Sequence, residues 1–262
     1  MKLYRYEKFE KKRLNTLENG QLWCSSPLNF NDKFDSRFNI NPKPKKVFSS
    51  EFISLLSKTP FIDHPFDHEA VESMIVTLTE TEDLKKIIRR VYDHLKSRDN
   101  ILSTTAVNCF FSKGPFDYLM WAHYGDNHNG ICVEYEVNCH DDNSLSEHNI
   151  YEVNYTSLIP KISIEEFLFC PNQTLTTILT RKSIEWSHEK KYRLVLLNSI
   201  KNKNSGTLVK LPEILKPSAI IAGSNVTNQK KQELRKRFSN KCCLYEIEVD
   251  YSECVLSRKR MV

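Results

Sequence analysis

Polar and aromatic side chains gather in three stretches of this sequence, and each stretch combines groups that could bind a ligand or move a proton. The first stretch joins the N-terminal segment to a turn that follows the second apolar segment. Its candidate ligand-binding residues are Arg5, Tyr6, Ser25, Asn31 and Asp32. An arginine between two tyrosines can present its planar fork of donors to a phosphate, a carboxylate or a ribose. The structural alternative is that Arg5 pairs with Asp32 or Asp35 and fixes the loop.

The second stretch, residues 118–130, places aromatic rings beside two histidines. Its candidate residues are Trp121, His123, Tyr124 and His128. The indole and the phenol offer a stacking surface, and an imidazole can carry a proton near neutral pH. The two histidines and Asp126 could suggest a metal, but no other part of the chain supplies matching ligands, so we expect no metal site. The structural alternative is a set of side chains that simply fill the core.

The third stretch, residues 182–193, holds a carboxylate beside a tryptophan, just before an apolar segment. Its candidate residues are Trp186, Glu189 and Arg193. From the edge of a pocket, Glu189 could act as a general base or could orient a substrate. The structural alternative is a surface ion pair between Glu189 and Arg193 or Lys182, which would contribute little to stability.

The hydrophobic pattern predicts an α+β fold, with one mixed, mainly antiparallel sheet flanked by helices in a single domain over residues 1–262. Strands are expected at 3–6, 21–24, 106–111, 131–137, 151–155, 192–197, 219–222 and 244–249. Helices are expected at 8–18, within 118–130, at 173–184 and at 228–238. Strict alternation over 131–137 is typical of a half-buried strand. Residues 48–98 are interpreted as a helical insertion, either a lid or an ordinary covering layer.

The amino-acid composition argues against several classes of protein, among them P-loop, structural-zinc and membrane-spanning proteins. Six glycines leave no Gly-rich phosphate loop, and eight cysteines without a CxxC pair argue against structural zinc. Four of the eight cysteines sit singly in apolar segments, and we expect all eight to be reduced. Those four are Cys24, Cys109, Cys132 and Cys170. No apolar stretch is long enough to span a membrane, and the N-terminus lacks the pattern of a signal peptide, so we expect a cytoplasmic protein.

The charge is mildly basic, with a formal net charge of +5 and a pI of about 8.6. Basic residues concentrate late in the chain, first over 228–241 and then over 258–260. A solvated helix face explains such a segment most simply. A patch that contacts the phosphates of a nucleic acid is the alternative. The oligomeric state is left open.

Three motifs together resemble a large bacterial family catalogued as domain of unknown function 2971. They are LENGQLW at 17–23 with SSP at 25–27 and FND at 30–32, LMWAHY at 119–124 with HNGIC at 128–132, and WSHEK at 186–190 with YR at 192–193. The resemblance spans residues 3 to 250 approximately and implies no established reaction. The chain departs from the family pattern at Lys33, where proline is usual, and at Lys191, where a second acidic residue is frequent. If that carboxylate is catalytic in relatives, the departure at Lys191 implies altered or absent activity.

The opening strand, helix, strand and Ser-rich turn also resemble, at the level of fold, the ADP-ribosyltransferases. That resemblance implies NAD as substrate, with Arg5 or Tyr6 on the first strand, Tyr124 or Trp121 stacked on nicotinamide, and Glu189 at the ribose. Such a carboxylate would stabilise the positive charge that develops as the nicotinamide–ribose bond breaks. A bacterial toxin or phage-defence effector would fit this activity. His123 completes the expected catalytic set with Tyr124 and Glu189.

Two other interpretations remain open. One is a non-catalytic module that binds a nucleotide-like ligand or a nucleic acid with the same aromatic pocket. The other is a metal-independent RNA-cleaving enzyme in which His123 or His128 acts as the acid or base. We expect Arg5, Trp121, His123, Tyr124 and Glu189 to line one pocket in the folded protein, although they are distant in the sequence.

Overall fold

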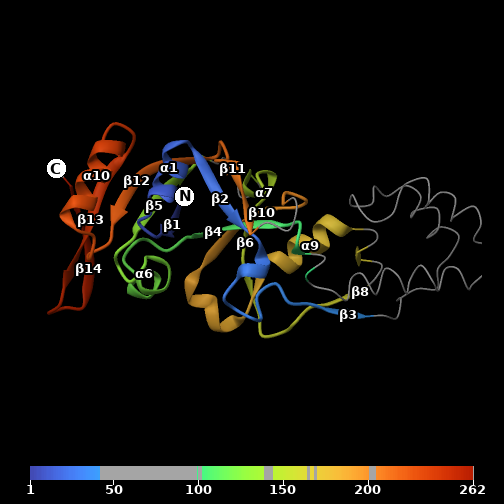
Figure 1. Cartoon of the computed structure of the whole chain (residues 1–262). Helices are drawn as coiled ribbons and strands as arrows, with labels where there is room; N and C mark the ends of the chain where they lie inside the picture. The colour runs from blue at the N-terminus through green and yellow to red at the C-terminus, as the bar shows by residue number, and fades with distance from the viewer. Residues whose placement is uncertain are drawn as a thin grey trace, which may run out of the picture.

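The computed structural model describes residues 1–41, 99, 102–138, 144–163, 166–167, 170–200 and 205–261. It confirms the predicted α+β class, because a ten-stranded, mainly antiparallel sheet is packed against several helices (Figure 1). The helical insertion expected over 48–98 lies outside the described residues. Among the described residues, no helix is both long enough and apolar enough to cross a bilayer.

The described strands are β1 (Lys2–Glu7), β2 (Gln21–Ser25), β3 (Asn39–Asn41), β4 (Ala106–Phe111), β5 (Ile131–Val137), β6 (Ile150–Glu152), β7 (Asn154–Tyr155), β8 (Lys161–Ser163), β9 (Arg181–Lys182), β10 (Lys191–Leu196), β11 (Gly206–Lys210), β12 (Leu215–Ala222), β13 (Cys243–Asp250) and β14 (Val255–Arg260). The described helices are α1 (Lys11–Glu18), α6 (Tyr118–Tyr124), α7 (Ser144–Glu147), α9 (Pro171–Leu179) and α10 (Asn228–Phe238), with 3-10 helices η1 (Pro27–Asn29) and η2 (Ile184–Glu189).

The main sheet has the order β11-β2-β4-β1-β5-β12-β13-β14, and β10 pairs with both β4 and β6. Only β12 and β13 run parallel within it, and α10 connects them. The pairs β3–β8 and β7–β9 form two small parallel sheets of their own. Figure 1 shows α10, β13 and β14 at one end of the molecule, far from α9.

The sheet forks at β4. One edge of β4 pairs with β10 along its whole length, from Ala106 to Phe111. On the other edge, β2 meets it only at Val107 and β1 meets it only at Phe111. Residues 108–110 therefore face a gap between β1 and β2, where side chains take the place of a continuous ladder.

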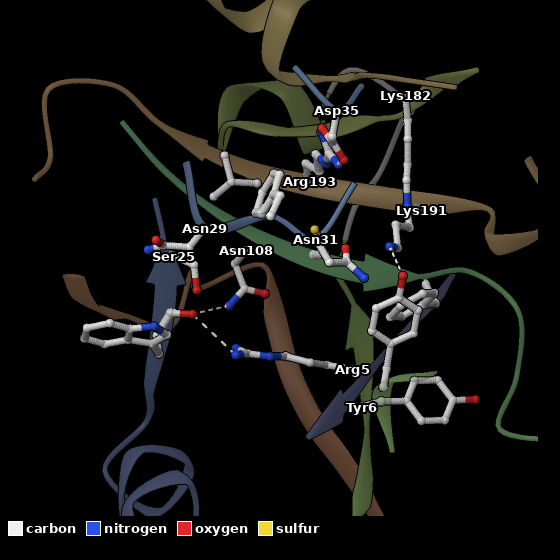
Figure 2. A pocket seen from close by; sticks show the side chains of 16 residues that line it. Arg5, Tyr6, Ser25, Asn29, Asn31, Asp35, Asn108, Lys182, Lys191 and Arg193 are labelled. Atoms are coloured by element: carbon white, nitrogen blue, oxygen red, sulfur yellow. Dashed lines mark hydrogen bonds and ion pairs between the residues drawn. The ribbon is translucent and has the colours of Figure 1, made fainter. Parts of the chain in front are cut away.

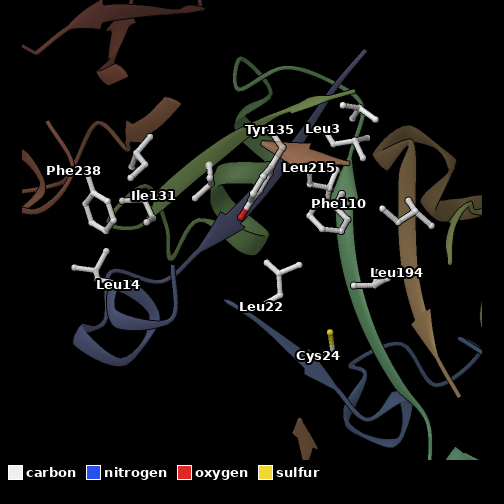
Figure 3. Packing of buried hydrophobic residues seen from close by; sticks show 14 of the residues in the cluster. Leu3, Leu14, Leu22, Cys24, Phe110, Ile131, Tyr135, Leu194, Leu215 and Phe238 are labelled. Carbon is white, nitrogen blue, oxygen red and sulfur yellow. The ribbon is translucent and has the colours of Figure 1, made fainter. Parts of the chain in front are cut away.

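Three apolar clusters hold the layers together. On one face of the sheet, Leu14 of α1 and both Leu234 and Phe238 of α10 belong to a cluster with strand residues such as Leu3 and Val133. Figure 3 shows Leu14 and Phe238 beside Ile131 of β5. On the other face, α6 contributes residues to a cluster with the tyrosines of β1. The residues of that cluster include Tyr4, Tyr6, Met120, Trp121 and Cys132. A third cluster places α9 beneath β4 and β10.

Two expectations about burial were wrong. Residues 131–135 are buried on both faces and not half-buried, because Cys132 packs near Trp121 while Glu134 is enclosed by Lys2 and Arg258; within 131–137 only Glu136 is exposed. Cys170, expected in an apolar setting, is exposed. The seven cysteines within the described residues are all free of disulfides.

The helix expected over 173–184 ends early, at Leu179. Arg181 then takes an extended conformation in β9, and its guanidinium donates to the carbonyls of Phe34, Thr156 and Leu158. These three bonds satisfy a buried arginine that a helix surface would have left exposed. The chain continues as η2, which delivers Glu189 to the start of β10.

Candidate functional site

A pocket of about 230 Å³ opens in the fork between β1, β2 and β4, with β10 forming its far wall (Figure 2). Its aromatic walls are Tyr6, Trp23, Phe30, Phe111 and Tyr124. Its cationic residues are Arg5, Lys182, Lys191 and Arg193. Amide side chains come from Asn29, Asn31 and Asn108, and the hydroxyl of Ser25 lies at the end of β2. A ligand here would meet rings, amides and an excess of positive charge together.

Glu189 lies behind this pocket and is completely buried. Its Oε2 atom is 2.7 Å from Lys182 Nζ and 2.9 Å from Lys191 Nζ, while its Oε1 atom accepts a hydrogen bond from the phenol of Tyr124. The ammonium of Lys191 also donates to that phenol oxygen, at 3.0 Å. Glu189 was expected at the edge of a pocket or in a surface ion pair, and it is in neither place. Its pair with Lys182 is buried.

The chain folds into this arrangement through one left-handed residue. η2 ends at Glu189, Lys190 takes a φ of 49°, and β10 begins at Lys191. Because Lys190 reverses the local twist, its own side chain is exposed while those of Glu189 and Lys191 are both buried. Tyr124 is the last residue of α6, so that helix aims its final ring at the same point.

Burial and ion pairing shift the pKa of Glu189 in opposite directions. Burial alone would raise the pKa of Glu189, but the ammonium groups of Lys191 and Lys182 hold this pKa below its usual range. Burial, and then the neighbouring Lys191, lower the pKa of Lys182 to about 8. Burial and the Glu189 carboxylate raise the pKa of Tyr124 well above its ordinary value. Tyr124 therefore stays protonated and donates to Glu189.

A second buried pair fixes the far wall. Arg193 donates to both carboxylate oxygens of Asp35, at 2.9 and 2.5 Å, and to the carbonyl of Leu179 at 2.5 Å. Burial would raise the pKa of Asp35, but the Arg193 guanidinium keeps this pKa below its usual range. The loop after β2 is thereby tied to β10 through Asp35. Neither Asp32 nor Asp35 pairs with Arg5, which corrects the structural alternative given above.

Arg5 and Asn108 bridge the fork. Arg5 Nη2 and Asn108 Nδ2 both donate to the carbonyl of Trp23, at 3.3 and 2.9 Å (Figure 2). Arg5 Nε also lies 3.0 Å from a carboxylate oxygen of Glu7. The remaining polar atoms of the two side chains, Arg5 Nη1 and Asn108 Oδ1, are buried and have no hydrogen-bond partner among the described residues. One donor and one acceptor of these two pocket-lining side chains thus remain unpartnered.

The structure brings several of the predicted residues to this pocket. Those that line it are Arg5, Tyr6, Ser25, Asn31, Tyr124 and Arg193, with Glu189 directly behind. Of the five residues expected to line one pocket, Arg5 and Tyr124 do so, Glu189 lies behind it in contact with Tyr124, and neither Trp121 nor His123 lines it.

The other predicted residues lie elsewhere. Trp121 is fully buried, donates from its indole to the carbonyl of Pro115, and stacks against His128. Burial lowers the pKa of His128. His123 is exposed beside Trp186, and Asp32 accepts from the backbone N–H of Phe34. Trp186 covers the ammonium of Lys182, 4.0 Å from the ring centroid, and does not line the pocket.

Sequence reasoning missed three residues of the site. Asn108 is a polar residue inside the apolar run of β4, a signal that a buried partner or ligand is required. Lys191 was treated only as a departure, yet it lies two residues before Arg193, a spacing that puts both side chains on one face of β10. Lys182 was considered only as the partner in a surface pair. Among the described residues, no group of three His, Cys, Asp or Glu side chains is arranged to hold a metal ion.

Comparison with known families gives one match, which covers the segment from α6 to β10. Residues 120–194 match the family described as "Protein of unknown function (DUF2971)". The matched segment contains Tyr124, Lys182, Glu189, Lys191 and Arg193, so it supports the resemblance noted from the sequence for this half of the site. Comparisons with curated proteins and with solved structures found no match.

Proposed function

We propose that the pocket in the fork of the sheet binds a small anionic ligand whose planar ring carries an amide-type edge, and that this ligand is a nucleotide such as NAD. The observation that supports this most strongly is the unpartnered pair of polar atoms, Arg5 Nη1 and Asn108 Oδ1. A buried polar group without a partner costs about 1–3 kcal/mol. A carboxamide or a nucleobase edge offers an acceptor and a donor together, so it would satisfy both atoms.

The charge and the rings of the pocket support the same ligand class. Four cationic side chains line it, and Asp35 is the one carboxylate among its lining residues. Phosphate groups suit Lys191 and Arg5, because charge-assisted hydrogen bonds to phosphate are strong in partly buried sites. The exposed parts of Phe30 and Trp23 offer faces for a planar ring.

Cleavage of the nicotinamide–ribose bond is the second candidate, and the meeting of Arg5, Tyr124 and Glu189 favours it. A carboxylate that stabilises the ribose must touch it, whereas Glu189 is held by two ammonium groups and a phenol. We therefore assign Glu189 the role of positioning Lys191 and Tyr124. Cleavage would require Glu189 to exchange one of these contacts for the substrate. Neither His123 nor His128 lines the pocket, so no observation favours RNA cleavage.

Titration calorimetry of the purified chain with NAD and with AMP tests this proposal, together with an assay of NAD consumption. Asn108→Leu removes the unpartnered acceptor at nearly constant volume. It should weaken NAD binding about tenfold or more, which corresponds to about 1.4 kcal/mol. The control Asn138→Leu changes an exposed asparagine away from the pocket and should leave affinity unchanged. Absence of binding to either nucleotide at millimolar concentration would overturn the proposal, and measurable NAD consumption would establish the second candidate.

A further inference from the structure

A second hollow is lined by residues of β5, β12, α10, β13 and β14, and none of these residues lines the pocket in the fork. Figure 1 shows α10, β13 and β14 together at one end of the molecule. Its volume is about 530 Å³. Basic side chains from three elements converge on it: Lys216 of β12, Arg235 of α10 and Arg260 of β14, joined by Lys241 after α10. One carboxylate, that of Glu136, lines it.

Ion pairing separates the basic residues of the C-terminal region into two groups. Those paired with a carboxylate are Lys231 with Glu246, Arg237 and Lys241 with Glu18, Arg258 with Glu134, and Lys259 with Glu248, and of these only Lys241 lines the hollow. Within the part of the chain that the structure describes, Lys216, Arg235 and Arg260 have no ion pair. Arg235 Nε is in addition buried without a hydrogen-bond partner among those residues. Three unpaired cations from three different elements thus meet at this hollow, whereas the other lysines of α10 without an ion pair among the described residues, Lys230 and Lys236, do not line it.

We propose that this hollow binds the phosphate groups of a nucleic-acid strand. It is larger than one phosphate needs, since pockets of about 300–1,000 Å³ enclose ligands of nucleotide size or more. No aromatic residue lines it, so it has no platform on which a base could stack. Positive charge without stacking surface is suited to the sugar–phosphate backbone and not to the bases. The inference is independent of the function assigned to the pocket in the fork.

Fluorescence anisotropy with a labelled single-stranded oligonucleotide of mixed sequence tests the proposal at several salt concentrations. The variant Lys216→Ala/Arg235→Ala/Arg260→Ala should bind about tenfold or more weakly at low salt. The slope of log K against log salt should decrease by about 2, because three phosphate contacts are lost on a single strand. Circular dichroism should show an unchanged fold, since Lys216 and Arg260 are exposed.

The matched control removes three exposed lysines that have no ion pair within the described residues and lie outside the hollow: Lys8→Ala/Lys161→Ala/Lys236→Ala. It should keep both the affinity and most of the salt slope. The proposal is overturned if the two triple variants bind equally, or if the wild type fails to bind the oligonucleotide at low salt.

Titration with AMP tests whether the hollow binds the phosphate of a free nucleotide instead of a strand. If AMP binds, its binding is lost only in Lys216→Ala/Arg235→Ala/Arg260→Ala, and the oligonucleotide does not bind, the ligand of the hollow is a free nucleotide. That result would also overturn the proposal of a nucleic-acid strand.

Discussion

The phenol of Tyr124 donates a hydrogen bond to Oε1 of Glu189, although the two residues are 65 positions apart in the chain. This contact connects the end of α6 to the start of β10 beneath the pocket. It also explains how a fully buried carboxylate is tolerated, because Lys182 and Lys191 occupy its other oxygen. Each member of the cluster therefore depends on the other three.

The first prediction concerns the charge of Glu189. Glu189→Gln leaves Lys182 and Lys191 without their counter-ion in a buried site, and it should reduce the free energy of unfolding by about 3–5 kcal/mol. Urea unfolding at neutral pH measures this change. The control is Glu185→Gln, an exposed position in the same 3-10 helix, which should change stability by about 0.5 kcal/mol or less. Equal stability of the two variants would show that Glu189 is not enclosed by the lysines.

The second prediction concerns Lys182, whose pKa burial lowers to about 8 from 10.5. Between these values the unfolded chain holds a proton that the folded chain has released, so this residue makes stability rise with pH. The wild type should therefore gain stability relative to Lys182→Met between about pH 8 and pH 10. Urea unfolding of both proteins at the two ends of this window provides the measurement. An unchanged difference between them would contradict the lowered pKa.

The third prediction concerns the pair of Asp35 and Arg193. Asp35→Asn leaves the buried guanidinium without its carboxylate and should cost about 3–5 kcal/mol at neutral pH. Because the pKa of Asp35 lies below 3.8 in the folded chain, its contribution is present above that pH and is lost as the pH falls. The wild type and the variant should therefore approach each other in stability under acid. Asp126→Asn, an exposed control, should show no such convergence.

Much of the architecture is predictable from local patterns. Alternation predicts strands over 131–137 and 151–155, where β5, β6 and β7 lie, and the helix expected over 8–18 does end at Glu18, before Gly20 at a φ of 63°. Periodicity failed at residues 180–184, because the buried hydrogen bonds of Arg181 override the helical pattern that ends at Leu179. Such long-range contacts leave no trace in the spacing of apolar residues.

The sequence predicted several residues of the candidate site but not how they are arranged in space. Polar residues in aromatic surroundings marked Arg5, Tyr124 and Glu189, and the structure does bring them together. The same signal also selected Trp121, which fills the core, since an aromatic ring carries no mark of whether it faces a ligand or a helix. The fork at β4, which makes the pocket, follows from strand pairing and has no signature in the sequence.

Hydrogen–deuterium exchange of the chain with and without saturating NAD tests most directly the claim that the fork of the sheet is the ligand site. The account predicts slower exchange in peptides from β1, β2, β4 and the start of β10, the four strands that surround Arg5, Trp23, Asn108 and Lys191. Peptides from α10 should be unaffected, because this helix contributes nothing to the pocket. Protection confined to other elements, or no protection under conditions in which calorimetry detects binding, would contradict the claim.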